Sequence, residues 1–404
     1  MIRRLKKDTE LKNLYSQFVT EYIELGHCKI LPETETNSEL VYYMPHHCVL
    51  RPGSSSTKLR VVFDASAKSS SGKSLNDLLM IGPSVQDSLF DIVLRFRFYR
   101  YAFTADVQKM YRMILVDERD TSFQRILWRD DKTKKLKEIE LTTVTYGTAA
   151  APFLATRALN QLAEDENDSF PAASKVVKKS VYIDDVLSGA ESLNEAKQLQ
   201  VDLVQLLRRG GFELHEWCAN NAELLNDIPM ERQEKQLDFK NNEVNETINK
   251  LGLLWDPVED CFAFRVNSVE SNYDNVTKRQ VMSEIAKLFD PLGLLGPIIV
   301  IAKIIMQDLW REGLAWDEKL TDDQLIIWKR LRNDLPEIAK MRIPRLVKSD
   351  DPHDYRALSP GHFLIGRELN AVAEPLYEDI KENSLETTKI AVLPTVDNEE
   401  QEIK

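Results

Sequence analysis

The sequence contains few cysteines and few glycines, and it lacks a long uninterrupted apolar run. Its four cysteines are widely scattered and form no CxxC pair, which argues against a disulfide framework and favours a reducing compartment. With 14 glycines and 16 prolines among 404 residues, the chain is neither collagen-like nor of low complexity. Because 43% of the residues are hydrophobic, the chain is too apolar to be wholly disordered, and its length suffices for two or three domains.

The hydropathy of the sequence predicts neither a signal peptide nor a membrane-spanning helix. Residues 1–13 carry positive charge, but no apolar stretch follows them. The longest apolar run, Leu294–Met306, contains Pro297 and Lys303 and is shorter than the roughly 20 residues that span a bilayer. We therefore expect a buried helix there, and a soluble intracellular protein, cytoplasmic or nuclear, that binds no membrane.

The charge of the chain is negative overall but unevenly distributed. A net charge of −12 argues at first against a nucleic-acid partner. Residues 51–157, however, carry 18 Lys and Arg against 12 Asp and Glu, whereas residues 374–404 carry three lysines against nine acids. A mildly basic segment beside an acidic tail is compatible with a nucleic-acid partner, although a solvated charge pattern without a partner would look similar.

Three aspartates at apolar, strand-like runs carry the main chemical signal. Asp184 and Asp185 lie within the β-rich run 180–187, and Asp106 ends the run 101–106. A hairpin turn would place Asp184 and Asp185 at its tip, which avoids burying unpaired carboxylates; for this pair alone, a plain surface turn is an equal alternative. Three carboxylates gathered at strand ends can hold two Mg²⁺ ions, which suits nucleotidyl transfer by in-line displacement.

Two other metal or phosphate patterns are weaker. The tripeptide at 72–74, Gly-Lys-Ser, resembles the end of a P-loop, but Ala67 stands where that motif needs glycine. The His-Cys pair at 27–28 and the His-His-Cys run at 46–48 lack the regular spacing of zinc ligands. We interpret these histidines and cysteines as structural.

A series of motifs follows one another with few gaps from about residue 40 to residue 340. The motifs are Tyr43–Val49, Lys58–Ser66, Ser74–Leu79, Thr104–Tyr111, Gln124–Trp128, Val144–Phe153, Tyr182–Asp185, Gly210–Leu214, Leu251–Trp255 and Phe289–Leu294. In content and order this series resembles the reverse transcriptase region of the BEL/Pao class of LTR retrotransposons. A later segment, Leu358–Arg367, resembles a stretch that follows the integrase core in such elements, which suggests either an internal deletion or a gene model that skipped the intervening sequence.

The resemblance implies an α+β right-hand polymerase fold with fingers, palm and a helical thumb- or connection-like region. The implied divisions are an N-terminal helical segment (1–35), fingers (36–100), a palm (101–260) with an inserted fingers portion at about 118–140, the thumb- or connection-like region (261–347) and a polar acidic tail (348–404). Because only about 60 residues follow Pro344, we expect the RNase H and integrase catalytic cores to be absent.

The function implied is that of an RNA-directed DNA polymerase that adds dNTPs to a primer on an RNA or DNA template. Mg²⁺ would be the cofactor, with Mn²⁺ as a possible substitute. By the resemblance, Asp106, Asp184 and Asp185 would be catalytic, and together with Val107 they would bind the metal ions.

The same resemblance assigns the substrate contacts. Lys58 and Arg60 would bind the triphosphate, for which the planar fork of arginine donors is suited; the alternative for Lys58 is a solvated lysine of the fingers. Tyr111 would lie beneath the sugar and exclude a 2′-hydroxyl, with an ordinary packed aromatic as the alternative, and Gly147 would shape the nucleotide pocket. The primer grip would consist of Leu251, Gly252, Leu253, Leu254 and Trp255.

One departure from the family pattern concerns the reaction. Glu216 stands where the family has a lysine, and a carboxylate that is ionised at neutral pH cannot act as a general acid there. The alternative is therefore a catalytically weak or inactive remnant that only binds nucleic acid. The intact set of three aspartates favours the enzyme, whereas Glu216 and the shortened chain favour the remnant.

Overall fold

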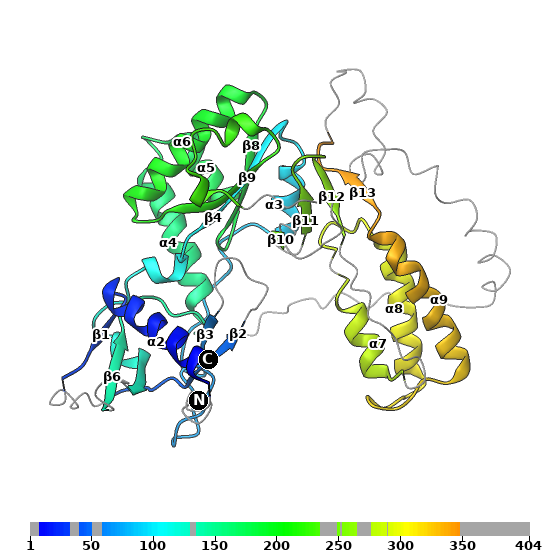
Figure 1. Cartoon of the computed structure of the whole chain (residues 1–404), viewed down its shortest axis with the longest axis horizontal. Coiled ribbons are helices and arrows are strands. Elements are labelled where there is room, and N and C mark those ends of the chain that lie inside the picture. The colour runs from blue at the N-terminus through cyan, green and yellow to red at the C-terminus, as the bar shows by residue number, and fades with distance from the viewer. Residues whose placement is uncertain are drawn as a thin grey trace, which may run out of the picture.

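The computed structural model describes residues 8–32, 40–50, 59–129, 135–234, 249–250, 253–264, 276–288 and 290–347. These residues form a mixed α/β fold, in which Figure 1 shows an N-terminal, a central and a C-terminal group of elements. Within the described ranges, no helix has both the length and the hydropathy needed to cross a membrane.

The N-terminal group packs one helix against short antiparallel strands. Helix α2 (Thr9–Glu24) begins at Asp8, whose carboxylate accepts a hydrogen bond from the Leu11 amide at 2.9 Å. The strands are β1 (Cys28–Ile30), β2 (His46–Leu50), β3 (Leu59–Phe63), β5 (Arg125–Arg129) and β6 (Leu136–Leu141), arranged as a β1-β6-β5 sheet and a β2–β3 hairpin. Residues on one face of α2 are buried against these strands, as the helical spacing of its apolar residues predicts.

The central group is an antiparallel sheet with helices on one face. Its strands are β4 (Tyr101–Val107), β7 (Val181–Tyr182), β8 (Asp185–Ala190) and β9 (Leu214–Ala219), in the order β7-β8-β4-β9. Phe103, Ala105 and Val107 of β4 pack against α4 (Ala151–Asp165), α5 (Pro171–Lys179) and α6 (Leu193–Arg209). Because side chains alternate along a strand, Ala102, Thr104 and Asp106 belong to the opposite face of the sheet.

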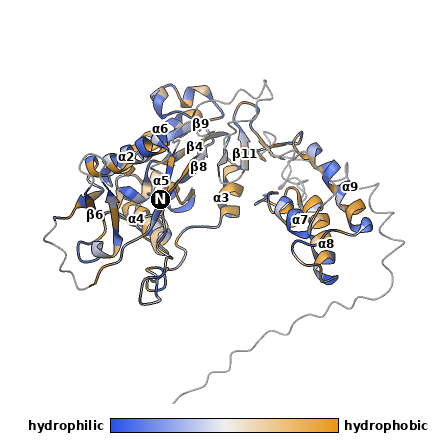
Figure 2. Ribbon diagram, turned by 60° about the horizontal axis from the view of Figure 1, so that its bottom comes forward, coloured by the Kyte–Doolittle hydropathy of each residue, from blue (hydrophilic) through white to orange (hydrophobic). Residues whose placement is uncertain are grey.

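Helix α3 (Leu89–Phe96) connects the central and C-terminal groups. Its residues Ile92, Val93 and Phe96 share one core with Ala102 of β4 and with the C-terminal group, and the helix is largely hydrophobic in Figure 2. The C-terminal group contains α7 (Lys278–Ile285), α8 (Gly296–Arg311) and α9 (Asp322–Ile338), and a sheet of β10 (Asn249–Lys250), β11 (Leu253–Asp256), β12 (Cys261–Ala263) and β13 (Arg342–Pro344).

A buried polar network joins the same two groups. The Arg345 guanidinium donates to both carboxylate oxygens of Asp260, at 2.6 and 2.7 Å. Asp260 also accepts hydrogen bonds from Trp255 Nε1 at 3.0 Å and from Asn220 Nδ2 at 3.1 Å. Since Asn220 Oδ1 accepts from the Ala102 amide of β4 at 2.8 Å, the network connects the central sheet to β13.

Candidate active site

The turn between β7 and β8 brings the three predicted aspartates together through the backbone. Tyr182 pairs with Asp185, so that Ile183 and Asp184 form a two-residue turn. Asp185 lies directly opposite Asp106 of β4, and the Asp184 carbonyl accepts a hydrogen bond from the Val107 amide at 2.8 Å. Residues opposite each other in an antiparallel pair share one face of the sheet, with Cβ atoms roughly 4.5–5.5 Å apart. Asp106 and Asp185 therefore project from the face that α4, α5 and α6 leave uncovered.

The donor chemistry of this site fits a divalent cation. Asp106, Asp184 and Asp185 are all half-buried and offer hard oxygen ligands of the kind that Mg²⁺ prefers. Among the described residues, however, no three His, Cys, Asp or Glu side chains are close enough together to hold a metal ion. Shared metal coordination by these aspartates stays a prediction.

Tyr111 lies near both Asp184 and Arg60, although each is far from it in the sequence. Tyr111 belongs to the short 3₁₀ helix η1 (Met110–Met113) that follows β4, and Arg60 is an exposed residue of β3. Burial and the negative charge of Asp184 raise the pKa of Tyr111, while the positive charge of Arg60 opposes this rise. The structure thus brings a cation and a carboxylate of the predicted site within electrostatic reach of the Tyr111 phenol.

Gly147 occupies a position that no other residue can take without strain. Its φ is +100°, and a Cβ atom there would lie 2.4 Å from the carbonyl oxygen of Phe63 in β3. Asn76 fixes the same loop, because its amide donates to the Gly147 carbonyl at 3.1 Å and accepts from the Ala149 amide at 2.7 Å. Asn76 stands within one of the family-like motifs, Ser74–Leu79, but nothing in its local sequence indicates this contact.

For the remaining predicted site residues the structure either gives no description or shows a buried side chain. Lys58, Leu251 and Gly252 lie outside the described residues, and of Leu253 only its place in β11 is described. Leu254 and Trp255 are 6% and 3% exposed, respectively. Because these two side chains are buried, any contact of this hairpin with a primer would fall to its backbone or its other residues. The Val107 side chain is buried on the helix-covered face, so only its backbone can take part in the site.

The strand on the other side of Asp106 carries two further polar residues. His215 of β9 lies opposite Asp106, so that Asp185, Asp106 and His215 form a row across β8, β4 and β9. Glu216 follows at a positive φ of 49°, where the register between β4 and β9 shifts as in a β-bulge. Sequence reasoning did not find His215, because only the strand register reveals its position.

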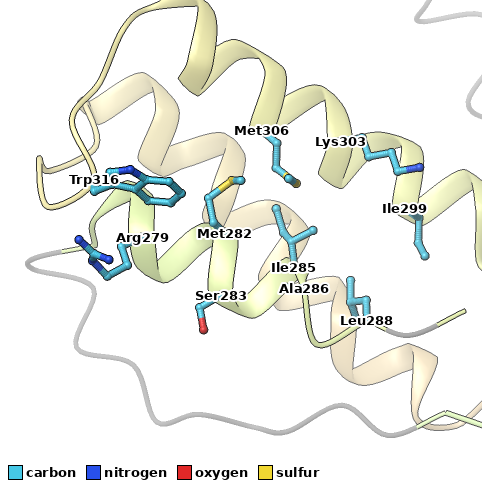
Figure 3. A pocket seen from close by; sticks show the side chains of 10 residues that line it. All are labelled: Arg279, Met282, Ser283, Ile285, Ala286, Leu288, Ile299, Lys303, Met306 and Trp316. Atoms are coloured by element: carbon cyan, nitrogen blue, oxygen red, sulfur yellow. The ribbon is translucent and has the colours of Figure 1, made fainter. Parts of the chain in front are cut away.

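A separate cavity of about 530 Å³ lies between α7 and α8. Figure 3 shows apolar side chains such as Met282, Ile285 and Met306 lining it, with Arg279 and Lys303 among its polar members. None of the predicted site residues contributes to this cavity.

Sequence comparison finds one family match. Residues 277–359, about a fifth of the chain, match the family described as Pao retrotransposon-like RNaseH-like domain. This match supports a retroelement relationship, but through an RNaseH-like domain and not through a reverse transcriptase region. The match overlaps the region 261–347, for which the thumb- or connection-like assignment stays a prediction, and it goes against the expectation that no RNase H core is present. No curated protein matches the sequence.

Comparison of folds finds a viral reverse transcriptase among the similar solved structures. The foamy viral protease-reverse transcriptase dRH, solved in complex with double-stranded DNA, aligns with a TM-score of 0.53 and 15% sequence identity. The alignment covers 82% of this chain and 49% of that chain, so this chain spans about half the length of its structural neighbour. At this identity the likeness shows the fold alone.

Proposed function

We propose that this chain is an RNA-directed DNA polymerase of a BEL/Pao-class retroelement that adds dNTPs to a primer on an RNA or DNA template. The observation that carries the proposal is the pairing of Asp106 with Asp185 beside the Asp184 turn, in a fold similar to that of a viral reverse transcriptase. In this proposal the central group is the palm, and the N-terminal group, with Arg60 on β3, provides the fingers.

The roles of the residues follow from their chemistry. Asp106, Asp184 and Asp185 would hold divalent metal ions. When bound, such ions would activate the primer hydroxyl and stabilise the leaving group. Arg60 would hold the triphosphate through its fork of donors. Tyr111, fixed next to β4 and near Asp184, would restrict the space beneath the sugar. Asn76 holds the loop that contains Gly147, and the absence of a side chain at Gly147 lets this loop approach β3 closely. In this position the loop would form one wall of the nucleotide pocket.

Primer extension on an RNA template, with Mg²⁺ or Mn²⁺, tests the proposal. We expect extension by the wild-type chain and a loss of more than about 100-fold in Asp185→Asn, because several kcal/mol of charge stabilisation disappear. Affinity for the primer–template, measured by fluorescence anisotropy, should change little, since phosphate contacts elsewhere supply most of it.

A matched control is Asp168→Asn, which removes the same charge from an exposed position outside the site. This variant should extend primers as the wild type does. A wild-type chain that binds primer–template but extends nothing with either metal would refute the polymerase and leave the binding-only remnant. Activity that persists in Asp185→Asn would refute the assignment of the aspartates.

A further inference from the structure

The turn that carries Asp184 contains a strained residue. Ile183 has a φ of +56°, in the left-handed region that β-branched residues rarely adopt. The first position of a two-residue hairpin turn with positive φ is normally glycine, asparagine or aspartate. Strain of this kind persists only where the surrounding structure holds the backbone in place, and it gathers at functional sites.

One side chain from a distant segment holds this backbone. The Oε1 atom of Gln86 accepts a hydrogen bond from the Ile183 amide at 3.0 Å, across 97 residues of sequence. Ile183 is half-buried and packs against the core beneath α4, α5 and α6. The hydrogen bond therefore fixes the peptide plane on one side of the strained residue, while packing fixes its side chain.

The segment that contains Gln86 is itself anchored at several points. Asn160 of α4 donates to the Val85 carbonyl at 2.9 Å. The Asp87 carboxylate pairs with Arg95 of α3 at 2.8 Å and with Lys179, the last residue of α5, at 3.2 Å. Lys179 lies two residues before β7, the strand that leads into the turn. The ion pair between Asp87 and Lys179 therefore ties the segment of Gln86 to the strand that carries Ile183.

We propose that Gln86 is a positioning residue for the turn that carries Asp184 and Asp185. By accepting the Ile183 hydrogen bond it keeps Ile183 at positive φ, which directs the Asp184 carbonyl to the Val107 amide and keeps Asp185 opposite Asp106. Without this acceptor the turn relaxes toward negative φ, and the aspartates leave their relative positions. The catalytic consequence rests on the proposed polymerase function, whereas the structural coupling does not.

Four variants separate this role from general destabilisation. Gln86→Met keeps the length of the side chain but removes the acceptor, and Gln86→Glu keeps an acceptor oxygen. Ile183→Gly removes the strain at positive φ. Gln161→Met is the matched control, because Gln161 is an exposed residue of α4 whose side-chain hydrogen bonds, within the described residues, go to Arg157 and Asp165 of its own helix.

The first measurement is steady-state primer extension. We expect Gln86→Met to lower kcat about tenfold with little change in the KM for dNTP, as the loss of one hydrogen bond that orients a reacting group would do. Gln86→Glu should retain more activity than Gln86→Met, and Ile183→Gly should restore most of the loss when combined with Gln86→Met. Gln161→Met should behave as the wild type.

The second measurement is thermal unfolding of the same variants in EDTA without nucleic acid. The change in Tm caused by Ile183→Gly should be less favourable in the Gln86→Met background than in the wild type, because the turn of Gln86→Met has already relaxed and has less strain to release. Additive Tm changes, or a Gln86→Met variant indistinguishable from Gln161→Met, would overturn the proposal. If no variant, the wild type included, extends a primer, the polymerase function fails while the Tm coupling still decides the role of Gln86.

Discussion

The buried pair between Arg345 and Asp260 gives a prediction whose size follows from the structure. The Arg345 side chain is 0% exposed, and the Asp260 side chain is 25% exposed. Removing one partner of a buried ion pair costs about 3–5 kcal/mol, because an uncompensated charge stays behind. Since water reaches part of Asp260, we expect Arg345→Met to lower the free energy of unfolding by about 3 kcal/mol, at the lower end of that range.

Urea unfolding followed by tryptophan fluorescence measures this cost, and Trp255, which donates to Asp260, reports on the network directly. The control is Arg279→Met, which breaks the pair between Arg279 and Asp317, whose side chains are 58% and 76% exposed. An exposed pair contributes only about 0–1 kcal/mol, and added salt should reduce that contribution further. Equal costs for the two variants would refute the conclusion that the network stabilises the junction between the central and C-terminal groups.

Three further predictions concern single residues. Tyr111→Ala should reduce the preference for dNTP over rNTP by about tenfold or more, measured as a ratio of kcat/KM values, and an unchanged ratio would remove Tyr111 from the site. Gly147→Ala should raise the KM for dNTP and lower the Tm more than Gly72→Ala does, since both glycines have positive φ but only Gly147 has a backbone atom within 3 Å of the added Cβ. Burial and neighbouring cations lower the pKa of His27 from 6.5 to about 4. Below pH 6.5, His27 therefore takes up a proton in the unfolded chain but not in the folded chain, which lowers the stability of the folded state. Between about pH 7 and pH 5 the Tm of the wild type should fall further than the Tm of His27→Gln. Equal decreases in Tm would contradict this prediction.

Local signals in the sequence predicted many elements close to their observed bounds. The β-branched, largely apolar run 59–63 forms β3, and the capping-box pattern of Ser192 and Glu195 starts α6, which ends before Gly210. The helical thumb- or connection-like character expected for 261–347 corresponds in secondary structure to α7, α8 and α9. These features are determined by side chains a few residues apart, which is why the sequence alone contains them.

Sequence also located the aspartates at strand-like runs, but it could not show how they meet. The pairing of Asp106 with Asp185, and the place of His215 beyond Asp106, depend on the register of strands that are distant in the chain. Register is set by packing of the whole sheet against its helices, so no local pattern encodes it.

The same reason explains the residues whose environment only the tertiary structure decided. Trp255 belongs to a motif expected to grip a primer, yet its ring is buried edge-on against Phe96 of α3, with centroids 5.1 Å apart. Gln86 resembles any polar loop residue until the fold places it against Ile183. The sequence by itself determined which residue types are available for chemistry. The tertiary structure decided which of them meet, because contacts across about a hundred residues of chain form only when the core assembles.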